Sequence, residues 1–200
     1  MSEPIKFYFD FSSPYGYFAA LRIDELAASF DREVEWHPMM LGAAMKVTGA
    51  QPLAEVPIKG DYCNNDWERL ARFMEVPWTL PDPFPIGTLA ASRAFYWLDD
   101  QDSGLAKRFA EAAFDTYFGQ GRDITAAEVV AEIAAPLGVD ADALLAAVQN
   151  PAIKQRLKDE TTKAIDDGVF GSPFFLIDGE PFWGADRLWM IRRWLKSGGW

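Results

Sequence analysis

The order of hydrophobic patterns along the 200-residue chain limits its fold more than any other feature. A short apolar run at 5–10 precedes an amphipathic helical pattern that begins near Pro14, and a second apolar run follows at 34–39. Proline is favoured at the first position of a helix, where its missing N–H costs no hydrogen bond. These three segments predict a β-α-β unit, whose crossover is expected to be right-handed.

The middle of the chain has a different pattern. Residues 66–168 show a helical period of 3.6 residues almost throughout, which predicts a large helical block. The segments 41–63 and 77–87 are rich in residues such as glycine and proline. Proline fixes its own backbone and restricts the residue before it, so these segments are expected to be loops.

The C-terminal part returns to a strand pattern. The stretch PFFLIDGEPFW, 173–183, has two apolar runs around Asp178-Gly179, a dipeptide that favours the tight turn of a hairpin, and an amphipathic helix follows. The expected class is therefore α/β. Its predicted domains are one formed by 1–40 together with 168–200 and a loop plus helical insertion at 41–167.

Charge and rare residues exclude several classes of function. The net charge of −11 argues against a nucleic-acid partner, because nucleic acid selects a basic face. The single cysteine, Cys63, permits no CxxC pair, and the single histidine, His37, leaves no zinc-type cluster, so no metal is expected. Residues 1–11 lack a secretion signal and no apolar run could cross a membrane. We therefore expect a reducing compartment, the cytoplasm.

Several motifs resemble the 2-hydroxychromene-2-carboxylate isomerases and the kappa-class glutathione transferases, which are cysteine-free relatives of the disulfide oxidoreductase DsbA. The resemblance spans essentially the whole chain and implies a thioredoxin-like fold with a helical insertion. Ala50 departs from the pattern, since relatives often carry asparagine there. The matching stretches are FYFDFSSPYGY at 7–17, MKVTGAQP at 45–52, VPIKGDY at 56–62 and GVFGSPFFLIDGEPFWGADRL at 168–188.

The resemblance implies a glutathione site around Ser13, which occupies the place of the first catalytic cysteine. A helix N-terminus stabilises a thiolate, and a serine hydroxyl can donate a hydrogen bond to it. The same serine fits a simple helix cap. The resemblance also implies a cis bond before Pro173 and a carboxylate, Asp186, that holds the γ-glutamyl ammonium. The residues assigned to glutathione are Ser13, Lys59, Ser172, Pro173, Ala185 and Asp186.

The implied reaction interconverts 2-hydroxychromene-2-carboxylate and trans-o-hydroxybenzylidenepyruvate, a step of naphthalene-type aromatic catabolism. Reversible addition of the glutathione thiolate would permit rotation about the alkene. Ser13 is then the expected catalytic residue, while Lys46 and Trp183 are expected to face the substrate. Relatives imply a homodimer.

Two alternatives stay open at this point. One is a kappa-type glutathione transferase or peroxidase that acts on electrophiles, and the other is a non-catalytic glutathione-binding protein. A disulfide oxidoreductase is excluded, because Cys63 is misplaced for that chemistry. His37 and Cys63 are both expected to be structural.

Overall fold

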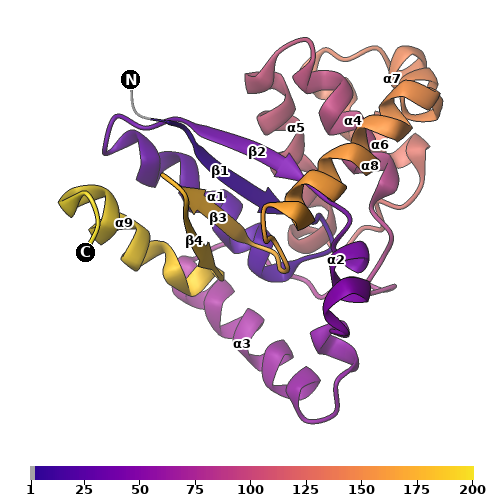
Figure 1. Cartoon of the computed structure of the whole chain (residues 1–200). Coiled ribbons are helices and arrows are strands. Elements are labelled where there is room, and N and C mark those ends of the chain that lie inside the picture. Colours follow the sequence, from indigo (N-terminus) through magenta and orange to yellow (C-terminus); the bar gives the residue numbers. More distant parts are fainter. Residues whose placement is uncertain (1–2) are drawn as a thin grey trace.

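The computed structural model describes residues 3–200 and contains a four-stranded mixed sheet (Figure 1). The strand order is β2-β1-β3-β4, with β1 parallel to β2 and β3 antiparallel to both β1 and β4. The α/β class is therefore confirmed. The strands are β1 (Ile5–Phe9), β2 (Val34–Pro38), β3 (Phe174–Ile177) and β4 (Glu180–Trp183).

The two ends of the chain fold as the sequence predicts. Helix α1 (Pro14–Ala28) starts at the predicted proline and connects the parallel strands β1 and β2. Strands β3 and β4 form the predicted hairpin, in which Asp178 and Gly179 have φ values of 53° and 85°. Both lie in the left-handed region that a two-residue hairpin turn requires.

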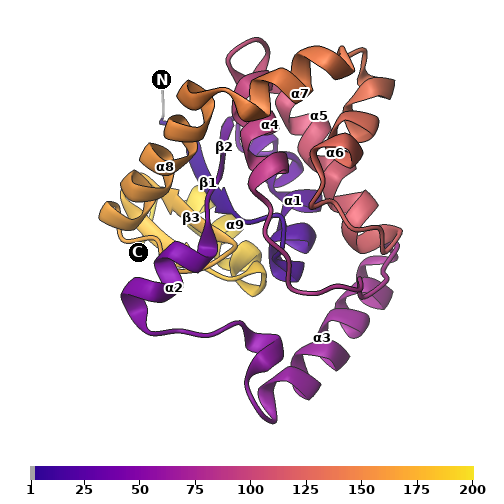
Figure 2. The ribbon, with the colours of Figure 1, turned by 90° about the vertical axis from the view of Figure 1, so that its right-hand side faces the viewer.

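Helices cover both faces of the sheet (Figures 1 and 2). Phe7 and Phe9 pack on the face covered by α1 and α9 (Leu188–Ser197). Tyr8 points the other way and packs in a smaller apolar cluster with α2 (Leu41–Thr48) and α8 (Pro151–Asp166). This alternation follows from the two-residue period of a strand, which sends successive side chains to opposite faces.

The helical block shares its core with the sheet. Phe9 of β1 packs against Phe95 and Phe114, with ring centroids 6.0 and 5.5 Å apart, so the main apolar cluster continues into the insertion. Within residues 3–200, no helix combines the length and apolar character that a membrane crossing demands. The remaining helices are α3 (Lys59–Met74), α4 (Leu89–Asp99), α5 (Ser103–Phe114), α6 (Ala127–Ala134) and α7 (Ala141–Gln149).

The prediction of a loop at 41–63 is wrong for much of that segment, because α2 and the first turn of α3 lie within it. The first N–H of α2, that of Leu41, donates to Asp10 Oδ2 at 2.9 Å, and Ala44 is buried against the sheet. These tertiary contacts stabilise a short helix whose glycine-containing sequence favours it only weakly. The loop expected at 77–87 is present.

Asp10, at the end of β1, connects three segments of the chain. Its Oδ1 accepts hydrogen bonds from Ser12 N at 2.8 Å and Thr88 Oγ1 at 2.9 Å, while Oδ2 accepts from Leu41 N. Only 7% of Asp10 is exposed. Burial raises the pKa of this carboxyl group, and the three hydrogen bonds act in the opposite direction.

We expect Asp10→Ala to lower the free energy of unfolding by about 3–5 kcal/mol, because it leaves buried donors without their acceptor. Asp140→Ala is the matched control. Asp140 is an exposed N-cap that accepts from Ala143 N, and its loss should cost about 1 kcal/mol. Urea denaturation measures both variants, and equal losses would contradict the connecting role of Asp10.

Candidate active site

The candidate site begins where β1 leads into α1. Ser13 is the N-cap of α1, and its Oγ accepts a hydrogen bond from Gly16 N at 3.0 Å. The same hydroxyl donates to the carbonyl oxygen of Ser172 at 2.9 Å. The capping interpretation of Ser13 is therefore confirmed, and its hydroxyl proton is directed at Ser172.

Ser172 lies against Ser13 from a distant part of the chain. The Ser172-Pro173 peptide bond is cis, as expected. Ser172 Oγ accepts a hydrogen bond from Asp10 N at 3.0 Å, so the loop before β3 is attached directly to the end of β1. Both serines are buried, with 6% of Ser13 and 9% of Ser172 exposed. Two serines thus meet at the N-terminus of α1 in a defined arrangement.

Gly16 is needed for this close approach. A Cβ atom at this position would lie 3.0 Å from Ser172 Oγ and 3.1 Å from Ser13 Cβ. Contacts this short require the neighbouring serine atoms to give way by a few tenths of an ångström. The glycine of the SPYG motif therefore serves packing of the serine pair.

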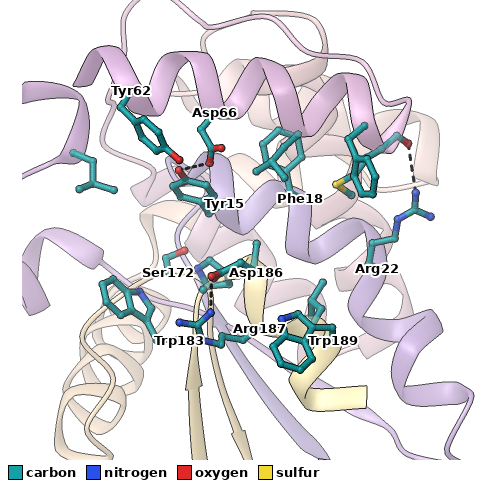
Figure 3. A pocket seen from close by; sticks show the side chains of 18 residues that line it. Tyr15, Phe18, Arg22, Tyr62, Asp66, Ser172, Trp183, Asp186, Arg187 and Trp189 are labelled. Carbon is teal, nitrogen blue, oxygen red and sulfur yellow. Dashed lines mark hydrogen bonds and ion pairs between the residues drawn. The ribbon is translucent and has the colours of Figure 1, made fainter. Parts of the chain in front are cut away.

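A cleft of about 960 Å³ opens beyond the serine pair (Figure 3). Tyr62 and Asp66 of α3 lie along one side, opposite Trp183, Asp186 and Trp189 (Figure 3). This volume is at the upper end of the range of about 300–1,000 Å³ that small-molecule sites occupy. The cleft is rich in exposed apolar side chains. Those that line it with at least two-fifths of their surface exposed are Leu53, Tyr62, Phe73, Trp183 and Trp189.

Asp186 stands on the open side of the cleft, in a 3-10 turn, η4 (Ala185–Arg187). Its Oδ2 accepts a hydrogen bond from Arg187 Nη1 at 2.6 Å. The side chains of Asp186 and Arg187 are 72% and 43% exposed, so the carboxylate is accessible to a ligand. Gly184 precedes the turn with a φ of 111°, a conformation that favours glycine.

Tyr15 closes the inner end of the cleft. Its hydroxyl donates to Asp66 Oδ2 at 2.9 Å and so links α1 to α3 (Figure 3). Burial, together with the hydrogen bond to Asp66 and the charge of that carboxylate, raises the pKa of Tyr15 well above its usual value. The phenol therefore stays protonated at neutral pH and acts as a fixed donor.

The structure brings together most of the residues predicted from sequence. The cleft is lined by Ser172, Pro173, Trp183, Ala185 and Asp186. Ser13 lies behind them and lines a smaller adjoining cavity.

Lys46 and Lys59 are placed differently. Both are exposed, and neither lines the cleft or the adjoining cavity. Lys46 lies in the last turn of α2, and Lys59 is the first residue of α3. Their roles stay predictions.

Several residues of the site were not predicted. The sequence places Asp10 only in a predicted strand, and it shows the cleft wall of α3 only as an ordinary helical pattern. Helical periodicity shows that one face of α3 is apolar, but it does not show that Phe73 is left 84% exposed beside a cleft. Tyr15 belongs to the Ser13-Pro14-Tyr15-Gly16 motif, but the sequence does not indicate its hydrogen-bond partner, Asp66, which is 51 positions away.

His37 and Cys63 line neither the cleft nor the adjoining cavity, so their structural roles stay predictions. The His37 ring stacks on Tyr8 with centroids 5.0 Å apart, and burial lowers its pKa. Cys63 is 5% exposed, and burial raises the pKa of its thiol, so it is not an activated nucleophile. In the described part of the chain, no three His, Cys, Asp or Glu side chains cluster in a way that could hold a metal ion.

Comparison with known proteins assigns the family. Residues 4–196 match the model of the DSBA-like thioredoxin domain. The 2-hydroxychromene-2-carboxylate isomerase of Sphingobium xenophagum is 32% identical over 197 residues, which cover 98% of this chain and 99% of the relative. The chain belongs to the 2-hydroxychromene-2-carboxylate isomerase family.

This member of the isomerase family is also similar to a solved isomerase structure and to a kappa-class glutathione transferase. A solved structure of a 2-hydroxychromene-2-carboxylate isomerase superposes with a TM-score of 0.88 at 25% identity, over 96% of this chain and 94% of the other. Glutathione S-transferase kappa 1 of Caenorhabditis elegans is 27% identical over 199 residues, covering 94% of this chain and 88% of the relative. The thioredoxin-like fold with a helical insertion is thus confirmed.

We expect Gly16→Ala to lower the free energy of unfolding by up to about 2 kcal/mol, because overpacking of the serine pair, about 1–3 kcal/mol, outweighs the gain of up to about 1 kcal/mol from the better helix propensity of alanine. Gly42→Ala, in α2, is the control, since its Cβ would meet nothing within 4 Å. There the better helix propensity of alanine should stabilise the protein by up to about 1 kcal/mol. Thermal denaturation compares the two, and a stabilised Gly16→Ala protein would contradict the packing argument.

Proposed function

We propose that this protein is a glutathione-dependent isomerase that interconverts 2-hydroxychromene-2-carboxylate and trans-o-hydroxybenzylidenepyruvate in aromatic catabolism. The observation that carries the proposal is the serine pair at the N-terminus of α1, which adjoins an open cleft bearing Asp186. The isomerase relative that is 32% identical over nearly the whole chain supports it.

The cleft fits an extended tripeptide thiol. The N-terminus of α1 carries about half a positive charge, which favours a thiolate placed near Ser13. Ser172 would offer its backbone N–H at the cleft wall, in the manner of strand addition, and Pro173 would contribute an apolar surface beside it. The exposed carboxylate of Asp186 would hold the α-ammonium of the γ-glutamyl group. Lys59 would contribute long-range attraction for the glycine carboxylate.

In this proposal the chain supplies orientation and the ligand supplies the thiol. Bound glutathione would supply a nucleophilic sulfur for reversible addition to the conjugated alkene, which permits rotation about that carbon–carbon bond without net oxidation. Ser13 must turn its hydroxyl proton from Ser172 O toward the sulfur to stabilise the thiolate. Tyr15, held by Asp66, keeps the inner wall of the cleft in place. Trp183 presents an apolar face, and Lys46 attracts the substrate carboxylate.

The proposal also covers the cellular setting and the assembly. Glutathione is kept reduced in the cytoplasm, where this reaction would occur. The active form is proposed to be a homodimer.

A kappa-type transferase is the second candidate. The similarity to glutathione S-transferase kappa 1 of Caenorhabditis elegans favours it, and it would use the same serine pair and cleft. It differs in outcome, because the electrophile would leave joined to glutathione. Product analysis after complete turnover separates the two: an isomerase returns all glutathione as free thiol.

We expect wild-type protein to bind glutathione in isothermal titration calorimetry and Asp186→Ala to bind at least tenfold more weakly, a loss of about 1.4 kcal/mol. The reason is the lost contact between the carboxylate and the α-ammonium. Asp142→Ala, which removes an exposed first-turn carboxylate of α7, is the matched control and should bind as wild type does. Failure of wild type to bind at millimolar glutathione would refute both enzymatic candidates.

We expect Ser13→Ala to lower kcat/KM for the chromene by roughly ten- to a hundredfold, since a hydrogen bond to a charged group contributes about 1.5–3 kcal/mol. Its pH profile should also move to higher pH, because the thiolate loses a donor. Asn150→Ala removes the N-cap of α8 and controls for lost capping. An unchanged pH profile in Ser13→Ala would restrict Ser13 to its capping role.

A further inference from the structure

The cleft extends beyond the groups that the proposed function uses. Tyr62 and Trp183 lie at one end of it, and Arg22 of α1 lies at the other, with Trp189 on the Arg22 side (Figure 3). Helix α1 packs against α9, and Arg22 contacts the end of α3, so three helices meet here. We call this part of the cleft its distal end. It is formed by Arg22, Phe73, Met74, Leu188 and Trp189.

Arg22 is the charged group of the cleft that lacks a close partner. Within the described residues, the charged side chains that line the cleft are Arg22, Asp66, Asp186 and Arg187. Asp66 accepts a hydrogen bond from Tyr15 at 2.9 Å, and Asp186 accepts one from Arg187 at 2.6 Å. Every charged group of the cleft other than Arg22 is therefore paired at a close distance.

The contacts that Arg22 does make are long. Its Nη2 lies 3.5 Å from the carbonyl oxygen of Met74, and its Nη1 lies 3.9 Å from Glu25 Oε2. Good N–H···O hydrogen bonds span about 2.7–3.2 Å, and a guanidinium carries several N–H donors. The side chains of Arg22 and Glu25 are 47% and 82% exposed, so water screens this ion pair and it contributes little. The guanidinium therefore has donors available for an anion.

Apolar side chains adjoin this cation in the cleft wall. Phe73 of α3 and Trp189 of α9 are large aromatic residues, yet they are 84% and 63% exposed. Leu188 and Met74 beside them are partly buried. Exposed apolar surface of this kind marks ligand-binding grooves, because covering it is favourable. A cation next to exposed apolar walls selects a ligand that has an anionic head and an apolar chain.

We infer that the distal end binds an amphiphilic carboxylate, such as a fatty acid, with its carboxylate on Arg22 and its apolar chain against Phe73 and Trp189. A planar carboxylate matches the planar guanidinium, which can bind both carboxylate oxygens at once. The chain covers the two aromatic side chains and removes them from water. This site uses neither the serine pair nor a thiol, so it goes beyond the proposed function.

The test is isothermal titration calorimetry of the full chain with decanoate and with decanol, which has the same chain length but no charge. Wild type should bind decanoate more tightly. Arg22→Gln should weaken decanoate about tenfold and decanol less than about twofold. Phe73→Ala should weaken both probes about fivefold, because both lose apolar contact. Arg72→Gln is the matched control and should leave both affinities unchanged, since Arg72 lies outside the cleft and has a similar exposed ion pair, with Glu68 at 3.7 Å.

Each arm can overturn the inference. Absence of decanoate binding to wild type, or equal weakening of decanoate by Arg22→Gln and Arg72→Gln, refutes the distal site. Equal weakening of decanoate and decanol by Arg22→Gln refutes the contact between carboxylate and guanidinium. Saturating glutathione should change decanoate affinity less than about twofold, and full competition would place decanoate in the glutathione site instead. Protein that binds decanoate but not glutathione keeps this inference and refutes the proposed function, and protein that binds glutathione but not decanoate does the opposite.

Discussion

The hydrogen bonds around Asp10 hold the site together. The Asp10 carboxylate joins the end of β1 to the starts of α2 and α4. The backbone N–H of Asp10 donates a hydrogen bond to Ser172 Oγ. A buried carboxylate is costly to desolvate and persists only where donors compensate it, as three do here. Segments that are distant in sequence are thereby fixed around one strand end, and the serine pair takes its geometry from them.

The site has surroundings that stabilise a thiolate but no thiol of its own. The N-terminus of α1 still offers its N–H donors and partial positive charge, capped by Ser13 in place of a nucleophile. In the proposed reaction the thiol belongs to bound glutathione, which leaves the site chemically unchanged. The proposed chemistry is therefore consistent with a chain whose single cysteine is buried and has a raised thiol pKa.

Two adjoining spaces of different character meet at the serines. The large cleft is open and carries the accessible carboxylate of Asp186, while most residues that line the small cavity are apolar. Tyr15 and Leu53 stand between them.

Sequence patterns predicted the elements whose stability is local. The Asp178-Gly179 turn and the Pro14 helix start each depend on the backbone preferences of a few neighbouring residues, and both were predicted correctly. Helix α2 was missed, because its stability comes from Asp10 and the sheet and not from its own residues. Local propensity is a weak guide where tertiary contacts decide.

The sequence by itself determined the class of fold, the position of Ser13 at a helix start, and the exclusion of internal disulfide chemistry. Each of these depends on residue identity and spacing alone. Only the tertiary structure decided that Ser172 meets Ser13, that Asp66 holds Tyr15, and that Lys46 stays outside both cavities. These contacts join residues separated by 51 to 159 positions, and no local pattern encodes which side chains the packed core brings together.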